Sequence, residues 1–167
     1  MQSRIKETGI RMAGLLALLA AAMLAASCAG GAKAKDSGAV FSDVQGREWT
    51  LAEVKGPSAT IRLDRQQLEA SGFKGTYTLT FEEGRLSGMG APNRYFGPYT
   101  PGEGRSLVVG NIAATLMMGI SEPQDLPEHD YFSYLNRAAR WDIREGRLEL
   151  YSSDNTGAER VLVFTAQ

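Results

Sequence analysis

The stretch Arg85-Leu-Ser-Gly-Met-Gly-Ala-Pro-Asn-Arg-Tyr-Phe-Gly-Pro-Tyr99 decides how this chain folds. Its glycines and prolines interrupt any helical stripe, because both residues disfavour a helix interior. The stretch therefore predicts the end of one strand, a tight irregular loop and a second short strand. We expect Gly88 and Gly90 either to take a positive φ or to let the backbone approach a neighbour closely.

Alternating apolar and polar residues on both sides of this stretch predict further strands. Residues 76–81 place Tyr77, Leu79 and Phe81 on one face and threonines on the other, which is typical of a half-buried antiparallel strand. Residues 47–54 and 59–63 predict two earlier strands.

Short turns with glycine predict how the strands are joined. Glu-Gly-Arg occurs at residues 83–85 and 145–147, each time between apolar alternations. We expect Gly84 and Gly146 to supply the positive φ of tight hairpin turns. Residues 153–157 predict a third hairpin turn. Methionines Met117 and Met118 are interpreted as core filler.

One substantial helix is predicted over residues 127–139. Asp125 is the expected cap, and Phe132, Leu135 and Ala139 form the stripe expected to face the sheet. Asp64 is expected to cap a shorter helical turn. About eight short strands with one packed helix predict an α+β, mainly antiparallel β fold.

The central stretch resembles the signature of the META domain family, which runs roughly Gly-x-Gly-Gly-Cys-Asn-x-Tyr-x-Gly-x-Tyr. The matching residues are Gly88, Gly90, Asn93, Tyr95, Gly97 and Tyr99. Three further pieces resemble the family in order: Trp49-Thr-Leu51, then Gly110-Asn-Ile112 with Thr115-Leu-Met117, then Tyr131 through Leu135 with Leu148 to Leu150. The resemblance covers about residues 47–164 and implies a curved sheet or partly open barrel with one packed helix.

The first 27 residues predict a lipoprotein signal peptide. A basic start is followed by an apolar run at residues 12–26, which is short for a membrane span. The run ends in Leu24-Ala-Ala-Ser-Cys28, which resembles a bacterial lipobox, and Cys28 is the only cysteine. We expect a lipid at Cys28, a membrane as partner, and a location in the bacterial cell envelope. An ordinary signal peptide with an incidental cysteine is the alternative.

The domain organisation follows from this segment. Residues 28–42 are rich in glycine, alanine, serine and lysine and predict a flexible tether, and residues 43–167 form the expected META domain. The formal net charge is −1, which gives no reason to expect a nucleic-acid partner. We expect a monomer.

Few residues suggest chemistry. A single cysteine excludes an intramolecular disulfide and a cysteine-cluster metal site. His129 is the only histidine and is interpreted as an exposed helix residue. The chain has no phosphate loop, dinucleotide fingerprint or metal-ligand spacing, so we expect no cofactor, no metal and no enzymatic activity. A hydrolase with a carboxylate pair stays open, because carboxylate separation is a three-dimensional quantity.

The central loop is the best candidate for a binding site. Asn93, Arg94, Tyr95 and Tyr99 carry polar tips on an irregular loop, where function tends to lie. The alternative is that Asn93 bonds the loop backbone and that the tyrosines pack beneath it. Packing explains Arg94 least.

The leading hypothesis is a non-enzymatic, membrane-anchored envelope lipoprotein that binds an unknown envelope protein or ligand, or acts in envelope stress. The family resemblance implies links to heat shock, drug tolerance or secretion. A second hypothesis is an inhibitor or adhesin module that binds an external protein or glycan. A flat patch of aromatic residues and arginine around Arg94 would favour this second hypothesis.

Overall fold

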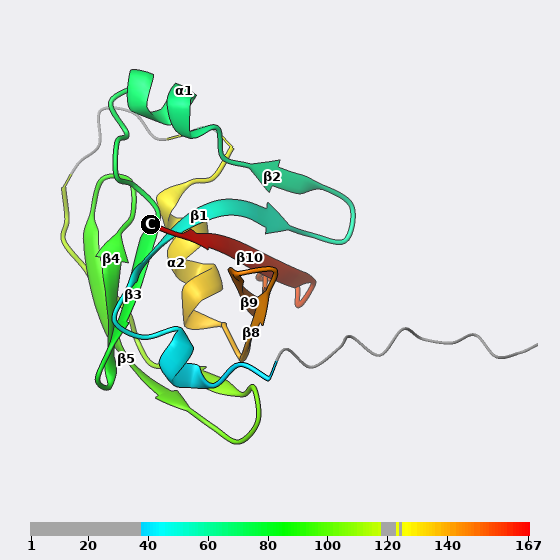
Figure 1. Ribbon diagram of the computed structural model, residues 1–167. Coiled ribbons are helices and arrows are strands. Elements are labelled where there is room, and N and C mark those ends of the chain that lie inside the picture. The colour runs from blue at the N-terminus through cyan, green and yellow to red at the C-terminus, as the bar shows by residue number, and fades with distance from the viewer. Residues whose placement is uncertain (1–37, 118–122, 124) are drawn as a thin grey trace, which may run out of the picture. The chain divides into compact units, whose positions relative to one another are not determined.

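The computed structural model describes residues 38–117, 123 and 125–167 (Figure 1). The predicted signal peptide, Cys28, most of the tether and Met118 lie outside the described residues. The elements are η1 (Phe41–Asp43), β1 (Glu48–Lys55), β2 (Thr60–Arg62), α1 (Arg65–Ala70), β3 (Thr78–Glu82), β4 (Arg85–Met89), β5 (Arg94–Pro101), β6 (Leu107–Val109), β7 (Ala113–Ala114), α2 (Glu128–Asn136), β8 (Arg140–Arg144), β9 (Arg147–Ser153) and β10 (Glu159–Ala166).

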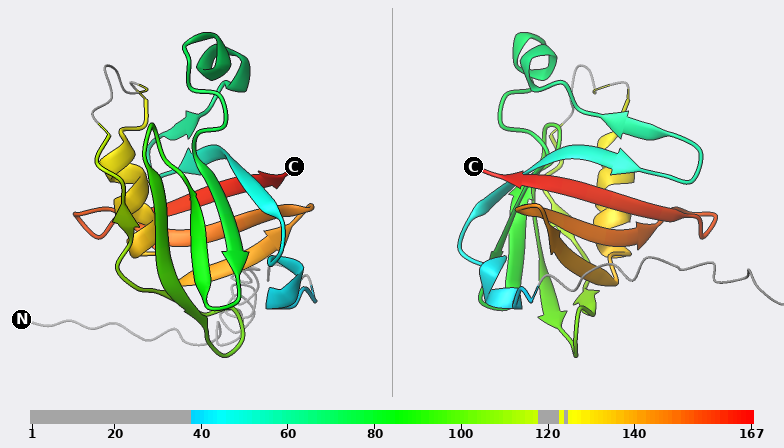
Figure 2. Two further views of the ribbon diagram at one scale, coloured as in Figure 1. Left: turned by 90° about the vertical axis from the view of Figure 1, so that its left-hand side faces the viewer. Right: turned by 45° about the vertical axis from the view of Figure 1, so that its right-hand side comes forward.

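The strands form one antiparallel sheet in the order β6-β5-β4-β3-β1-β10-β9-β8, with β2 beside β1 and β7 beside β5. The sheet curls until its two end strands nearly meet. The Leu107 backbone N–H donates to the Ala139 carbonyl oxygen at 3.0 Å, and the Trp141 backbone N–H donates to the Arg105 carbonyl oxygen at 2.9 Å. This nearly closed barrel confirms the predicted fold class. Figure 2 shows β3–β5 in green crossing β9 and β10 in orange and red, with α2 beside them.

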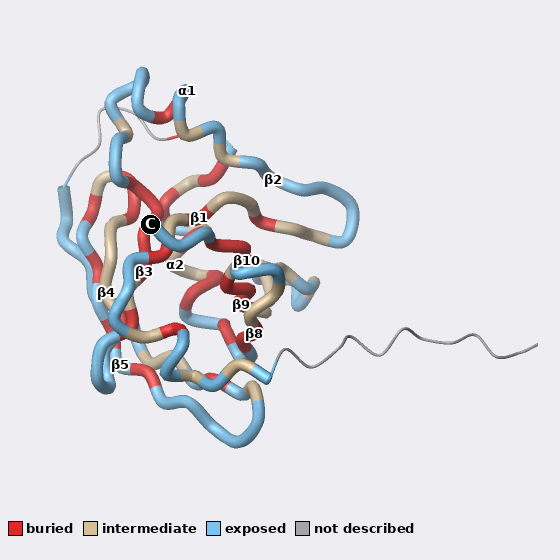
Figure 3. The backbone as a smooth tube through the Cα atoms, viewed as in Figure 1, coloured by how far each residue is buried: buried red, intermediate tan, exposed pale blue. Residues whose placement is uncertain are grey.

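The core lies inside the curled sheet, because alternate strand residues point inward. In β5, Tyr95, Gly97 and Tyr99 are buried while their neighbours Arg94 and Phe96 are exposed. Trp49, Leu51 and Val54 of β1 are buried in the same core, as the alternation predicts. Buried and exposed segments alternate along the strands in Figure 3.

The turns follow the sequence prediction. Gly84 and Gly146 have φ values of +69° and +73°, and their hairpins join β3 to β4 and β8 to β9. The third predicted hairpin joins β9 to β10. Asp64 caps α1, since its carboxylate accepts the backbone N–H groups of Gln66 and Gln67.

Helix α2 differs from its prediction at both ends and in its buried face. It runs over Glu128–Asn136, and Asp125 does not cap it. The buried residues are Glu128, Tyr131, Tyr134 and Leu135, whereas Phe132 is only partly buried and Ala139 is exposed outside the helix. Of the predicted stripe, Leu135 is buried, but the buried face is centred on the tyrosines rather than on Phe132 and Ala139. The Tyr131 hydroxyl donates to the Thr78 carbonyl oxygen at 3.1 Å, so this ring is buried with its polar end paired.

Two shorter segments also refine the prediction. Phe41, in the last residues assigned to the tether, packs its ring 5.4 Å from Phe81 and 5.1 Å from Trp141 between centroids. Phe41 therefore packs against the core of the barrel. Met117 is 61 % exposed, so it is not the core filler that the sequence suggested.

Candidate functional site

The loop between β4 and β5 fits closely against the helix and the neighbouring strand. A Cβ on Gly88 would lie 2.0 Å from the Thr78 carbonyl oxygen, and one on Gly90 would lie 2.4 Å from a Glu128 carboxylate oxygen. Neither glycine has a positive φ. Of the two expected reasons for these glycines, close approach is therefore the one that applies.

Glu128, the first residue of α2, accepts hydrogen bonds from this loop. Its Oε1 accepts the backbone N–H groups of Ala91 at 2.6 Å and Asn93 at 2.7 Å. Its Oε2 accepts the side-chain amide of Asn93 at 2.6 Å. Glu128 is only 8 % exposed, so these charge-assisted bonds replace the water that the buried carboxylate lost.

Asn93 extends this contact to the segment after β7. Its Oδ1 accepts the Met117 backbone N–H at 2.7 Å and the Thr115 hydroxyl at 2.9 Å. The Asn93 side chain therefore joins the loop, the helix start and residues 115–117. We call Asn93 and Glu128, with these partners, the loop latch.

Two predicted tyrosines of the site also point inward. The Tyr95 hydroxyl donates to the Thr78 carbonyl oxygen at 2.7 Å and lies 3.0 Å from the Tyr131 hydroxyl. Burial raises the pKa of Tyr95 well above its usual value, and the neighbouring Tyr131 raises it further. The Tyr99 hydroxyl donates to the Glu82 carbonyl oxygen at 2.6 Å. Both rings are part of the core.

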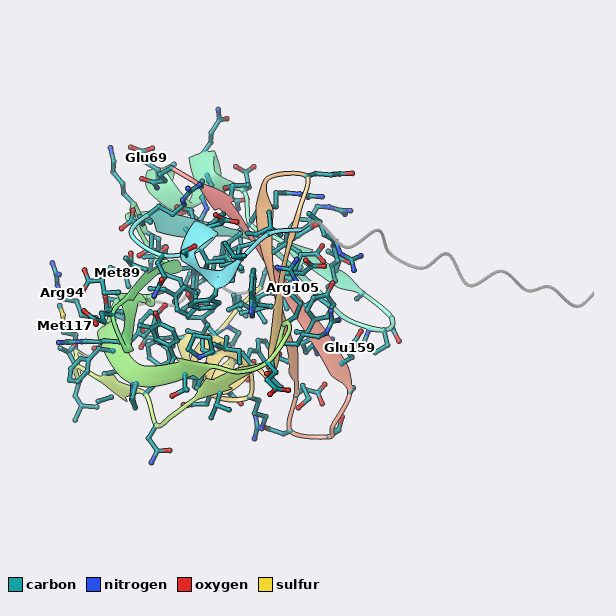
Figure 4. The ribbon with its side chains drawn as sticks, turned by 60° about the horizontal axis from the view of Figure 1, so that its bottom comes forward. Glu69, Met89, Arg94, Arg105, Met117 and Glu159 are labelled. Atoms are coloured by element: carbon teal, nitrogen blue, oxygen red, sulfur yellow. The ribbon has the colours of Figure 1, made fainter. Side chains whose placement is uncertain are left out.

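Arg94 is placed differently from the other three predicted site residues. Its side chain is exposed and has no hydrogen bond or ion pair among the described residues. Figure 4 shows Arg94 with Met89 and Met117 on one side of the molecule, at the outside of β4 and β5. Of the four predicted site residues, Arg94 is the one available to a ligand.

The sequence did not indicate two neighbours of Arg94. Phe96, two residues further along β5, is 48 % exposed. The Arg85 guanidinium of β4 lies over the Phe96 ring, 4.3 Å from its centroid. The alternation of β5 places Arg94 and Phe96 on one face of the sheet. Arg85 lies on the same face because the register of β4 and β5 pairs Ser87 with Phe96, and this register cannot be read from either strand alone. We call the outer face formed by Glu48, Thr80, Arg85, Ser87, Met89, Arg94 and Phe96 the open face.

A hollow of about 490 Å³ lies in the open face. The register explains it: Glu48, Thr80, Ser87 and Phe96 lie side by side across β1, β3, β4 and β5. The short Thr80 and Ser87 side chains lie between the longer Glu48 and Phe96, which leaves a depression. Arg85, Arg94 and Thr115 also line it.

No arrangement typical of catalysis was found in the described residues. A second hollow of about 460 Å³ lies along α2 and contains His129, whose side chain is 77 % exposed and pairs with Asp130. Neither hollow is lined by two carboxylates. The described part of the chain has no group of three or more histidine, cysteine or acidic residues placed to hold a metal. No helix in that part is long and apolar enough to cross a membrane.

Comparison with known proteins identifies the family. The sequence model of the META domain family matches residues 42–167. This chain belongs to the META domain family. A search of curated proteins found no match. Among solved structures, an NMR structure of a protein from Burkholderia xenovorans is similar, with a TM-score of 0.56 and 21 % identity. That alignment covers 81 % of this chain and 97 % of the other chain, and it shows a shared fold alone.

Within the META domain, the matching glycines and asparagine of the central stretch therefore serve the fold in this chain. Sequence reasoning did not single out Glu128 as a partner of the loop. The spacing of 35 residues between Asn93 and Glu128 gives no local signal. Glu128 can be recognised as a hydrogen-bond partner of the β4–β5 loop only from the three-dimensional structure, in which the loop lies beside the first turn of α2.

Proposed function

We propose that this chain is a lipid-anchored, non-enzymatic binding protein of the bacterial envelope, and that the open face of its META domain holds the partner. One observation carries the binding role: Arg94 is exposed without a partner among the described residues, beside the half-exposed Phe96. Arginine and aromatic residues contribute disproportionately to binding energy. Arginine also binds planar acceptors through paired hydrogen bonds.

The envelope location is supported by the sequence before the domain. The basic start, the short apolar run and Cys28 at the end of a lipobox-like segment favour lipid attachment. More than one acyl chain is needed for stable anchoring, since a single chain binds only marginally. Cys28→Ala should therefore move the protein from the detergent phase to the aqueous phase or leave it uncleaved. Unchanged partitioning would contradict the anchor.

A binding role is favoured over a carboxylate-pair hydrolase. Glycoside hydrolysis typically needs two carboxylates across the scissile bond. Among the described residues that line the open-face hollow, Glu48 is the one acid. The combination of Arg85, Phe96 and Arg94 instead matches the arginine and aromatic patch expected of a module that binds an external protein or glycan. The family resemblance implies links to heat shock, drug tolerance or secretion, and partner binding at this face is the step that would connect the protein to such a role.

Photo-crosslinking in intact cells tests this proposal. A photoreactive phenylalanine analogue at Phe96 should capture a discrete partner, because that ring lies in the open face. The matched control replaces Tyr151, whose ring stacks with Arg140 at 3.3 Å on the outer face of the other half of the barrel. Capture at both positions alike, or at neither, would contradict a binding role for the open face.

A further inference from the structure

We propose that the open-face hollow is a binding site for an acidic oligosaccharide, with Arg94 and Arg85 taking its carboxylates and Phe96 stacking against a sugar ring. This inference rests on the proposed binding function and specifies its ligand. The evidence is the charge, the hydroxyl groups and the strand pairing of the hollow.

The cations of the hollow are available to an anion. Arg94 and Arg85 make no ion pair within the described residues. The Arg85 guanidinium lies over the Phe96 ring, and the exposed Glu82 lies opposite Arg85 on β3. Arg85 lies opposite Pro98 and Met89 lies opposite Arg94, so the two arginines are four residues apart along β5. At about 3.3 Å per residue this separation is roughly 13 Å, which suits a ligand with more than one charged unit.

The rest of the lining matches sugar hydroxyl groups, which both donate and accept hydrogen bonds. Thr80 and Ser87 supply hydroxyls between Phe96 and Glu48. Hydroxyl side chains donate and accept, the Glu48 carboxylate only accepts, and guanidinium only donates. Glu48 lies three strands away from Phe96, so it disfavours an anion only at its own end. Phe96 adds the flat apolar surface on which the carbon face of a sugar ring can rest.

An acidic peptide fits this place less well. Extended peptides commonly bind by adding a strand to a free sheet edge. The hollow instead lies over β3 and β4, and β4 is hydrogen-bonded to β3 on one side and β5 on the other. Its backbone groups are therefore used within the sheet, and a peptide would have to bind through side chains alone.

The first test exposes the purified full chain in detergent to an array of immobilised probes. The probes are uronate and sialate oligosaccharides, their neutral counterparts and oligoglutamate peptides. We expect binding to acidic oligosaccharides and at least tenfold weaker binding to the neutral counterparts. Binding to oligoglutamate alone, or to no acidic oligosaccharide, would overturn the proposal.

The second test locates the site by substitution. Arg94→Gln and Phe96→Ala should each weaken binding to the best acidic probe at least tenfold. Arg140→Gln, which removes an arginine stacked on an aromatic ring on the other half of the barrel, should leave binding unchanged. Equal loss in all three variants, or none in Arg94→Gln, would overturn the assignment. If the array fails while crosslinking at position 96 still captures a partner, the ligand class is wrong and the proposed binding face stands.

Discussion

The two halves of the barrel differ in how their outer faces use charge. On β1, β8 and β9, several charged residues are paired with one another: Lys55 Nζ lies 3.3 Å from a Glu149 carboxylate oxygen, and Arg144 Nε lies 3.0 Å from an Asp142 oxygen and 3.5 Å from a Glu149 oxygen. Arg140 instead stacks on the Tyr151 ring. We call this surface the paired face. On the open face, Arg94 and Arg85 have no ion pair among the described residues. The same fold thus has one outer surface that contains a network of ion pairs and one on which two arginines have no ion pair among the described residues.

The difference lies in register as much as in composition. Asp142 and Glu149 are directly opposite one another on β8 and β9, which would be unfavourable for two acids without cations nearby. Arg144 lies between them and offsets the repulsion. On the open face, Arg94 lies opposite Met89, and Arg85 lies opposite Glu82 without an ion pair between them among the described residues. An acidic group of a partner would therefore gain more binding energy at Arg94 and Arg85 than at cations that already have an ion pair.

The largest expected effect concerns the loop latch, whose buried hydrogen bonds hold the β4–β5 loop beside the open face. Glu128→Ala removes the acceptor of three hydrogen bonds in the loop latch and leaves buried N–H donors unpaired. Because each such donor costs about 1–3 kcal/mol, we expect a loss of roughly 3 kcal/mol or more in the free energy of unfolding. Urea denaturation measures it, with the exposed neighbour variant His129→Ala as control. Equal urea midpoints for the two variants would show that the latch does not stabilise the loop.

A second prediction concerns the tyrosines beneath the open face. Burial raises the pKa of Tyr95 and of Tyr131 above the unfolded value of about 10. The unfolded chain therefore releases these protons first, so this stability is fully present below pH 10 and is lost as pH rises above it. The loss approaches about 1.4 kcal/mol per pH unit for each tyrosine. Urea midpoints between pH 9 and 11 should fall less steeply in Tyr95→Phe, and an unchanged slope would contradict the prediction.

The third prediction compares the two faces directly. Glu149→Gln removes a charge that Lys55 and Arg144 share, and Glu149 is only 6 % exposed. Lys55 and Arg144 are about two-fifths exposed, so solvent screening limits the loss to roughly 1 kcal/mol. The deficit should shrink in high salt. Arg94→Gln on the open face should show neither the deficit nor its salt dependence. The same salt-dependent loss in both variants would remove the distinction between the faces.

How far the sequence predicts this molecule depends on the range of each interaction. The hairpins at Gly84 and Gly146 were predictable, because a positive φ at a turn is a local requirement. The barrel followed from strand alternation together with the family resemblance. The buried face of α2 was misplaced, because the burial of Tyr131 depends on a hydroxyl partner in β3 that no helical periodicity reveals.

The candidate site was predicted only in part, for the same reason. Arg94 stood out because packing did not explain it, and the structure leaves it exposed. Asn93 could not be assigned to the latch, since its partners Glu128 and Met117 lie far along the chain. The hollow depends on four strands in register, and no single stretch of sequence contains that information.

The most direct test of the central claim, that Arg94 serves a partner and not the fold, is one variant measured in two ways. Arg94→Ala should leave the melting temperature within about 2 °C, the scale of a surface substitution. In intact cells, the same variant should reduce the partner captured from position 96 at least severalfold. A large fall in melting temperature would show that Arg94 belongs to the fold. Normal folding with unchanged capture would show that binding takes place elsewhere.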